Sequence, residues 1–104
     1  MNRNQTMLAL LSQLERQLKH QQLWQAEPPS PQALASTAPF AVDSLTPHQW
    51  LQWVLIPKFS AVIQAGHPLP SGFAIANYFE QVWQEQQQYQ PIVAILRKID
   101  QVGQ

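Results

Sequence analysis

The residues best suited to chemistry in this 104-residue chain lie close together near its centre. Tryptophan is a favoured anchor at protein interfaces, the glutamine amide both donates and accepts hydrogen bonds, and the lysine ammonium group attracts anions. Five residues of these kinds and one aspartate upstream make up the candidate binding site: Asp43, Gln49, Trp50, Gln52, Trp53 and Lys58. This set predicts binding of a partner or ligand.

Each candidate also has a structural interpretation. Large aromatic residues at helical spacing, such as Trp50 and Trp53, usually pack into a core. Lys58 is the only Lys or Arg between Glu27 and Glu80, and its stem could lie on apolar surface with the ammonium group in water. The other interpretation places Lys58 against an anionic group of a partner. The residue types leave both interpretations open.

The two glutamines leave a similar choice. A buried Gln49 or Gln52 must find hydrogen-bond partners. Their amides could bond to the backbone of residues 39–43, or they could be presented to a partner. The sequence does not separate these alternatives.

The sequence contains no arrangement typical of catalysis. It has no cysteine, which excludes a thiol nucleophile and a cysteine-ligated zinc site. Asp43 is expected just before a helix, where a carboxylate stabilises the helix dipole, and Asp100 is expected in solvent. The histidines lie on separate predicted elements without metal-ligand spacing: His20, His48 and His67. We therefore predict a protein that is not an enzyme and has no metal site or cofactor.

Charge limits the class of partner. Six Lys and Arg residues balance six Asp and Glu residues, so the net charge is zero. Nucleic-acid binding and polybasic membrane attachment both depend on an excess of cations, so the composition argues against them. The N-terminal apolar patch is short for a signal sequence, and the longest uncharged run is interrupted by proline and glycine. We expect a cytoplasmic protein.

The N-terminal half predicts one long helix and one short helix. Apolar residues recur at spacings of four, three and four within a helix over residues 5–25: Met7, Leu11, Leu14 and Leu18. Ser30 and Pro31 then predict the cap and first residue of a short helix. The apolar segment 38–42 is expected to be extended and to cover the core.

The clearest helix start is Thr46-Pro47-His48-Gln49, a capping box with proline in the first helical position. Apolar residues then continue around all sides of the predicted helix, which is typical of a central, buried helix. Pro57 falls inside it and predicts a kink. Gly66 predicts its end.

Two further helices complete the prediction. One begins near residue 76, and the polar run 84–90 follows it. The last begins at Pro91 and has one apolar stripe: Ile92, Ile95, Leu96 and Ile99. The chain (residues 1–104) is thus predicted to be a single all-α domain, a small bundle of four main helices plus a short helix, with a Pro-kinked central helix.

The sequence resembles the YqcC-like family of small bacterial helical proteins, which has no assigned activity. The resemblance covers nearly the whole chain and is strongest in these strings: Pro39-Phe40, Asp43-Ser44-Leu45, Gln49-Trp50-Leu51-Gln52-Trp53-Val54 and Ile56-Pro57-Lys58-Phe59. It implies a four-helix bundle. It also implies a connection, by genomic context, with a tRNA pseudouridine synthase, and it adds no catalytic residues.

These observations lead to one functional expectation and two alternatives. The first is a protein-interaction or accessory protein whose partner is a tRNA pseudouridine synthase. An alternative is a small-molecule binding bundle, with a pocket near Trp50, Trp53 and Lys58. A concave pocket with Lys58 at its mouth would favour this alternative over a flat docking patch. Direct tRNA binding is the third, and the lack of nearby cations argues against it. The sequence leaves the oligomeric state open.

Overall fold

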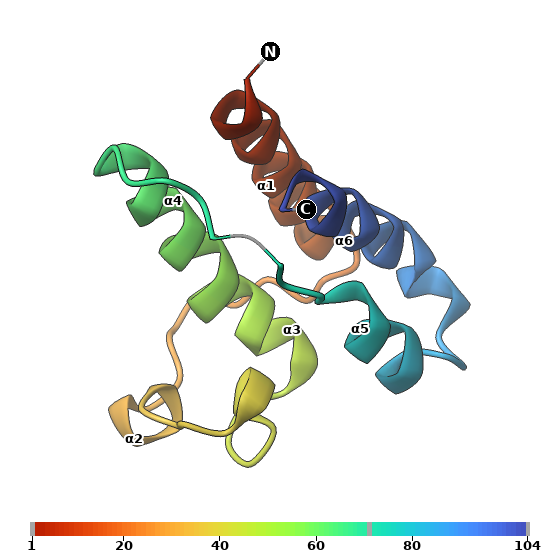
Figure 1. Cartoon of the computed structure of the whole chain (residues 1–104). Helices are drawn as coiled ribbons and strands as arrows, with labels where there is room; N and C mark the ends of the chain where they lie inside the picture. The colour runs from red at the N-terminus through yellow and green to blue at the C-terminus, as the bar shows by residue number, and fades with distance from the viewer. Residues whose placement is uncertain (1, 71, 104) are drawn as a thin grey trace.

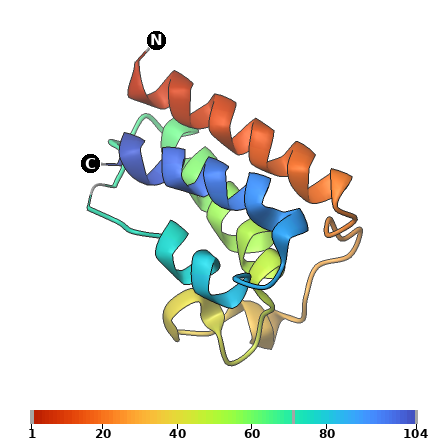
Figure 2. The same ribbon diagram turned by 90° about the vertical axis from the view of Figure 1, so that its right-hand side faces the viewer.

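The computed structural model describes residues 2–70 and 72–103. Two long helices, α1 (Arg3–His20) and α6 (Gln90–Val102), lie side by side in opposite directions (Figures 1 and 2). At one end of the pair, Arg3 Nε donates a hydrogen bond to the Val102 carbonyl at 2.9 Å. The apolar stripes predicted for both helices are buried, which confirms the helical periodicity seen in the sequence.

The central helix (residues 47–64) crosses this pair and consists of three consecutive parts. These are α3 (Pro47–Trp50), the π-helical turn η2 (Leu51–Leu55) and α4 (Ile56–Gln64). The predicted start is confirmed, since the Gln49 side chain accepts a hydrogen bond from the Thr46 amide at 2.8 Å. The predicted end is also confirmed, because Gly66 follows α4 in a left-handed conformation with φ of 76°.

The irregularity expected at Pro57 takes the form of the π turn just before it. The Ile56 amide donates to the Leu51 carbonyl, five residues back, in place of the α-helical partner four residues back. Proline lacks an amide hydrogen, and its ring crowds the carbonyl four residues earlier, so a wider turn accommodates it. The helix continues through Pro57 for two more turns.

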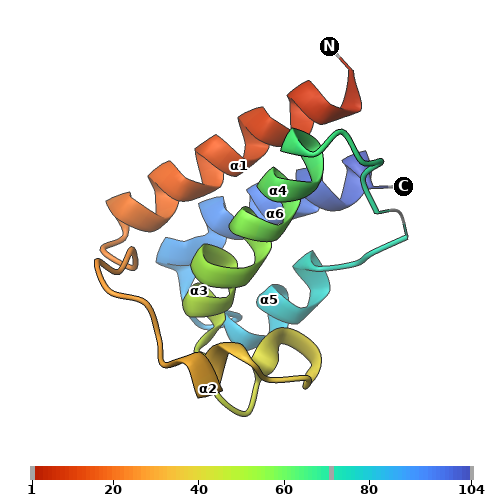
Figure 3. The same ribbon diagram turned by 90° about the vertical axis from the view of Figure 1, so that its left-hand side faces the viewer.

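Shorter elements join the three long helices. They are α2 (Pro31–Leu34), the 3₁₀ turn η1 (Pro39–Ala41), α5 (Ala76–Val82) and the 3₁₀ turn η3 (Gln87–Tyr89). The predicted cap of α2 is present, because Ser30 Oγ accepts from the Ala33 amide at 3.1 Å. Figures 1 and 3 show α2 near the α3 end of the central helix, with α5 beside α6. The described residues contain no strand, and the all-α prediction is confirmed.

One predicted helix end and one predicted backbone conformation are wrong. Helix α1 ends at His20, five residues before the predicted end, because Gln22 adopts a left-handed conformation with φ of 61°. The Leu23 amide then donates to the Leu18 carbonyl at 2.8 Å, which closes a Schellman-type helix end. Segment 38–42 is also not extended, since η1 turns sharply and Phe40 and Ala41 have φ of 55° and 49°.

Asp100 has a role that the sequence did not reveal. Instead of lying free in solvent, its carboxylate accepts hydrogen bonds from the backbone amides of Ile75 and Ala76 at 2.9–3.0 Å. These amides begin α5 and would otherwise lack partners, because the first amides of a helix have no intrahelical acceptor. A side chain of α6 therefore caps α5.

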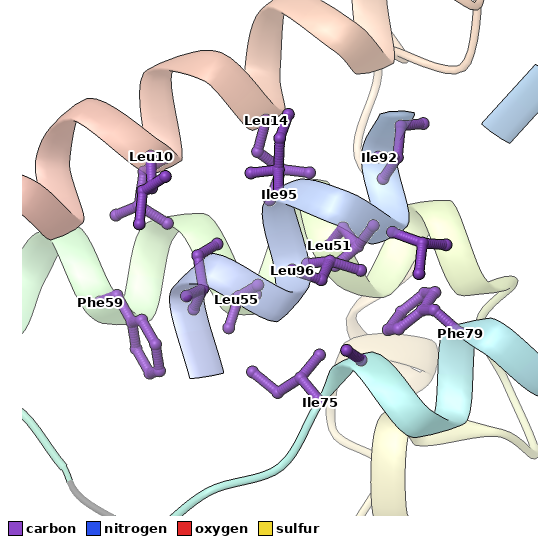
Figure 4. Close-up of a cluster of buried hydrophobic side chains, with 14 of the residues drawn as sticks. Leu10, Leu14, Leu51, Leu55, Phe59, Ile75, Phe79, Ile92, Ile95 and Leu96 are labelled. Carbon is purple, nitrogen blue, oxygen red and sulfur yellow. The ribbon is translucent and has the colours of Figure 1, made fainter. Parts of the chain in front are cut away.

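The hydrophobic core lies where α1, the central helix, α5 and α6 meet. Figure 4 shows Leu14 of α1, Leu51 of the central helix, Phe79 of α5 and Leu96 of α6 within one cluster. Each of these four side chains is fully buried. In the described part of the chain, no helix has both the length and the apolar character needed to cross a membrane.

Candidate functional site

An apolar hollow lies on one side of the central helix. Its volume is about 360 Å³, at the lower end of the range of small-molecule pockets. The central helix contributes five of the residues that line it: Trp50, Val54, Leu55, Lys58 and Phe59. Val54 and Leu55 belong to the π turn, so the irregular part of the helix forms part of the wall.

Two other segments complete the hollow. The turn η1 contributes Pro39 and Phe40. The segment leading into α5 contributes Pro70, Phe73, Ala74 and Ile75. Because these segments are far apart in the sequence, the hollow exists only when the chain is folded.

The Phe40 ring anchors one end of the hollow in an aromatic cluster. It stacks on Tyr78 with ring centroids 4.2 Å apart and an interplanar angle of 6°, and its centroid lies 4.9 Å from that of Trp50. At the other end, the rings of Phe59 and Phe73 lie 5.3 Å apart. Stacked and tilted aromatic pairs of this kind hold their rings in fixed orientations.

Lys58 is exposed, and it is the only charged residue among those that line the hollow in the described part of the chain. The two ion pairs among the described residues are elsewhere and join Lys19 to Glu15 and Arg97 to Glu80. The hollow thus combines an apolar surface with one positive charge that can reach water.

Three other candidates contact the segment after α1 and not the hollow. The Gln25 side-chain oxygen accepts hydrogen bonds from Gln49 Nε2 at 3.3 Å and from Trp53 Nε1 at 3.2 Å. The side chain of Gln52 is 4% exposed and bonds to the backbone of Gln25. The sequence left open whether the glutamine amides bond to the backbone or are presented to a partner. Gln52 does bond to the backbone, but to that of Gln25 and not to that of residues 39–43.

Asp43 belongs neither to the lining of the hollow nor to the residues that contact Gln25. Its carboxylate accepts a hydrogen bond from Ser36 Oγ at 2.6 Å and closes the loop that contains η1. The Ser44 hydroxyl beside it donates to the Ala33 carbonyl at 2.8 Å. Both contacts hold the loop against α2.

His48 is the one described residue whose pKa is clearly shifted. Burial lowers the pKa of His48 below its usual value of 6.5, and a backbone hydrogen bond with Leu23 acts in the opposite direction. Its Nδ1 atom is buried without a hydrogen-bond partner in the described structure. The side chain therefore favours the neutral form.

Of the six candidates, the structure brings Trp50 and Lys58 together in the hollow. Gln49, Gln52 and Trp53 surround Gln25, and Asp43 binds Ser36. Sequence reasoning missed Phe40 and Phe73 as wall residues. Helical periodicity could not identify them because neither lies in a helix that the sequence predicts. Phe40 was noted only as part of the apolar segment 38–42 and of the family-like string Pro39-Phe40, not as a site residue.

Comparisons with known proteins identify the family. Residues 6–102 match the DUF446 family, which is described as tRNA pseudouridine synthase C. The chain is 40% identical over 91 residues to the uncharacterized protein YqcC of Escherichia coli, and the match covers 86% of this chain and 84% of YqcC. The chain belongs to the YqcC-like family. An uncharacterized protein of Haemophilus influenzae is 39% identical over 97 residues, which cover 89% of this chain and 91% of that protein.

The YqcC-like fold has also been solved. The solution NMR structure of Escherichia coli YqcC superposes with a TM-score of 0.86 at 36% identity, and the match covers 98% of this chain and 88% of that one. A further relative, from Pectobacterium carotovorum, is named tRNA pseudouridine synthase C. It is 32% identical over 87 residues, which cover 84% of this chain but only 23% of that longer protein.

Proposed function

We propose that this YqcC-like chain is a non-enzymatic accessory protein that binds a tRNA pseudouridine synthase. The observation that carries the proposal is the Pectobacterium carotovorum relative, in which a stretch like this chain is 23% of a protein named tRNA pseudouridine synthase C. Covalent linkage holds two modules at a high effective concentration. When the corresponding module is a separate chain, a non-covalent interface can serve the same purpose.

Two acidic residues support a non-catalytic role. A pseudouridine synthase requires a catalytic aspartate, and both aspartates of this chain have structural partners. Asp100 accepts hydrogen bonds from the amides that begin α5, and Asp43 accepts one from Ser36. Both carboxylates therefore have roles in holding the fold together.

The test is direct binding between this chain and the tRNA pseudouridine synthase C of the same organism. We expect saturable binding in calorimetry, and the two purified proteins should coelute in gel filtration. A synthase for a different tRNA position serves as the control and should not bind. If no binding is detected with the proteins at about 50 μM, this partner is excluded. Such a result means that the binding free energy is weaker than about −6 kcal/mol.

A second candidate function is supported by the hollow itself. Its concave shape and single positive charge also suit a small molecule with an apolar body and one anionic group. Such a ligand should raise the melting temperature of the chain, because binding to the folded state stabilises it. Screening a panel of apolar carboxylates and phosphates would test this candidate. A melting temperature unchanged across the panel counts against it.

A further inference from the structure

We propose that the hollow is the docking site for a short apolar segment of the synthase that carries one acidic side chain, which pairs with Lys58. This inference rests on the proposed function and names the surface and the partner chemistry. Three features of the hollow carry it: strained backbone in its wall, its single charge and its length along the central helix.

The first feature is unusual backbone in two of the segments that line the hollow. Phe40 and the adjacent Ala41 are both left-handed, a conformation that residues other than glycine rarely adopt. The π turn of the central helix, which accommodates Pro57, also lines the hollow through Val54 and Leu55. The strain at Phe40 and Ala41 persists only where the surrounding structure holds it, and both strained segments and π turns are frequent at functional sites.

The second feature is the charge of Lys58. The other residues that line the described hollow are uncharged, so a ligand that fills it must be mainly apolar. Among residues 2–70 and 72–103, no carboxylate lies within 4.0 Å of the Lys58 ammonium group. An aspartate or glutamate on the docking segment would complement this charge and fix the orientation of the segment.

The third feature is length. Trp50 and Phe59 line the hollow nine positions apart on the central helix, which corresponds to about 13 Å of helix. An extended peptide covers this distance with about four residues. Because Lys58 is next to Phe59, the acidic residue of the segment is expected at one end, and the apolar residues should lie toward Trp50.

The test uses two variants of the hollow and two matched controls on α6. Lys58→Glu reverses the charge, and Ala74→Trp fills the hollow from an exposed position on its wall. Lys98→Glu and Ala94→Trp make the same changes at exposed positions outside it. We expect both hollow variants to weaken synthase binding by about tenfold or more, and both controls to remain within about twofold of the wild type.

Failure of this inference can be distinguished from failure of the proposed function. If the synthase binds the wild type and all four variants equally, the hollow is not the docking site, although the partner is correct. If the synthase does not bind the wild type, both proposals are wrong. Circular dichroism of each variant checks that the fold is retained, so that lost binding reflects the changed surface.

Charge exchange gives a second and more specific test. Overlapping peptides that span the synthase can be titrated against the chain, with tryptophan fluorescence as the signal. We expect a peptide with apolar residues and one acidic residue to bind, and Trp50→Phe to remove most of the fluorescence change. Replacing the acidic residue of the peptide with lysine should weaken binding to the wild type and restore binding to Lys58→Glu. If the lysine-substituted peptide does not bind Lys58→Glu better than it binds the wild type, the proposed pairing of Lys58 with the acidic residue is wrong.

Discussion

The side-chain amide of Gln52 forms two hydrogen bonds with the backbone of Gln25. Its oxygen accepts from the Gln25 amide at 2.8 Å, and its nitrogen donates to the Gln25 carbonyl at 2.7 Å. Gln52 is the one buried polar side chain in the described structure, so its amide replaces the water that both backbone groups would otherwise bind. It fastens the segment after α1 to the central helix.

Replacing Gln52 should therefore destabilise the fold. Gln52→Leu removes both hydrogen bonds and leaves the two backbone groups of Gln25 without partners, which should lower the free energy of unfolding by about 1–3 kcal/mol. Urea denaturation measures this change. Gln64→Leu, at an exposed position of the same helix, is the control and should change stability by less than about 0.5 kcal/mol. Equal effects of the two substitutions would contradict the role of Gln52.

The half-buried His48 predicts a dependence of stability on pH. Its pKa is lower in the folded chain than the usual 6.5, so the unfolded chain binds the proton more readily. The contribution of His48 is therefore complete above pH 6.5 and is lost as the pH falls from 6.5 through the lower pKa of the folded chain. Denaturation series between about pH 5.5 and pH 7.5 should show stability rising with pH.

A pair of variants assigns this pH dependence. His48→Gln should flatten the rise of stability between the two pH limits, because glutamine does not titrate. His67→Gln, at an exposed position, should leave the rise unchanged. If the free energy of unfolding of His48→Gln still rises with pH as steeply as that of the wild type, the pH dependence belongs to other groups.

The cap that α6 provides for α5 can be tested locally. Asp100→Ala removes the acceptor of the Ile75 and Ala76 amides and should cost about 1–2 kcal/mol, the usual effect of losing an N-terminal cap. Hydrogen exchange should accelerate most at the start of α5. Glu85→Ala, at an exposed position, should change neither stability nor exchange. Uniform acceleration along the chain would indicate global destabilisation without a local cap.

Gly103 should be required for the position of Phe73. A Cβ atom added at Gly103 would overlap the Phe73 ring, which lines the hollow. Gly103→Ala is therefore expected to displace that ring and to destabilise the chain by about 1–3 kcal/mol. In a Phe73→Ala background the same substitution should have little effect, because the ring is gone. Additive effects in this double-mutant cycle would show that the two residues are not coupled.

The sequence alone was enough to predict the features that depend on neighbouring residues. The apolar stripe of α1 from Met7 to Leu18 follows from helical periodicity, and the start of the central helix follows from Thr46, Pro47 and Gln49. The end at Gly66 follows from the freedom of glycine to adopt positive φ. All of these depend on interactions within a few positions of the chain, so a local pattern is sufficient to reveal them.

Only the tertiary structure decided how the candidate residues are used. Trp50 and Trp53 are three positions apart, yet Trp50 lines the hollow and Trp53 bonds to Gln25. The left-handed conformations of Gln22 and Phe40 could not be predicted from the sequence, because neither residue is a glycine. These outcomes depend on contacts between segments distant in the chain, such as Gln25 and Gln52, which are 27 positions apart. Such contacts arise only when the helices pack, because packing determines which side of the central helix meets each segment.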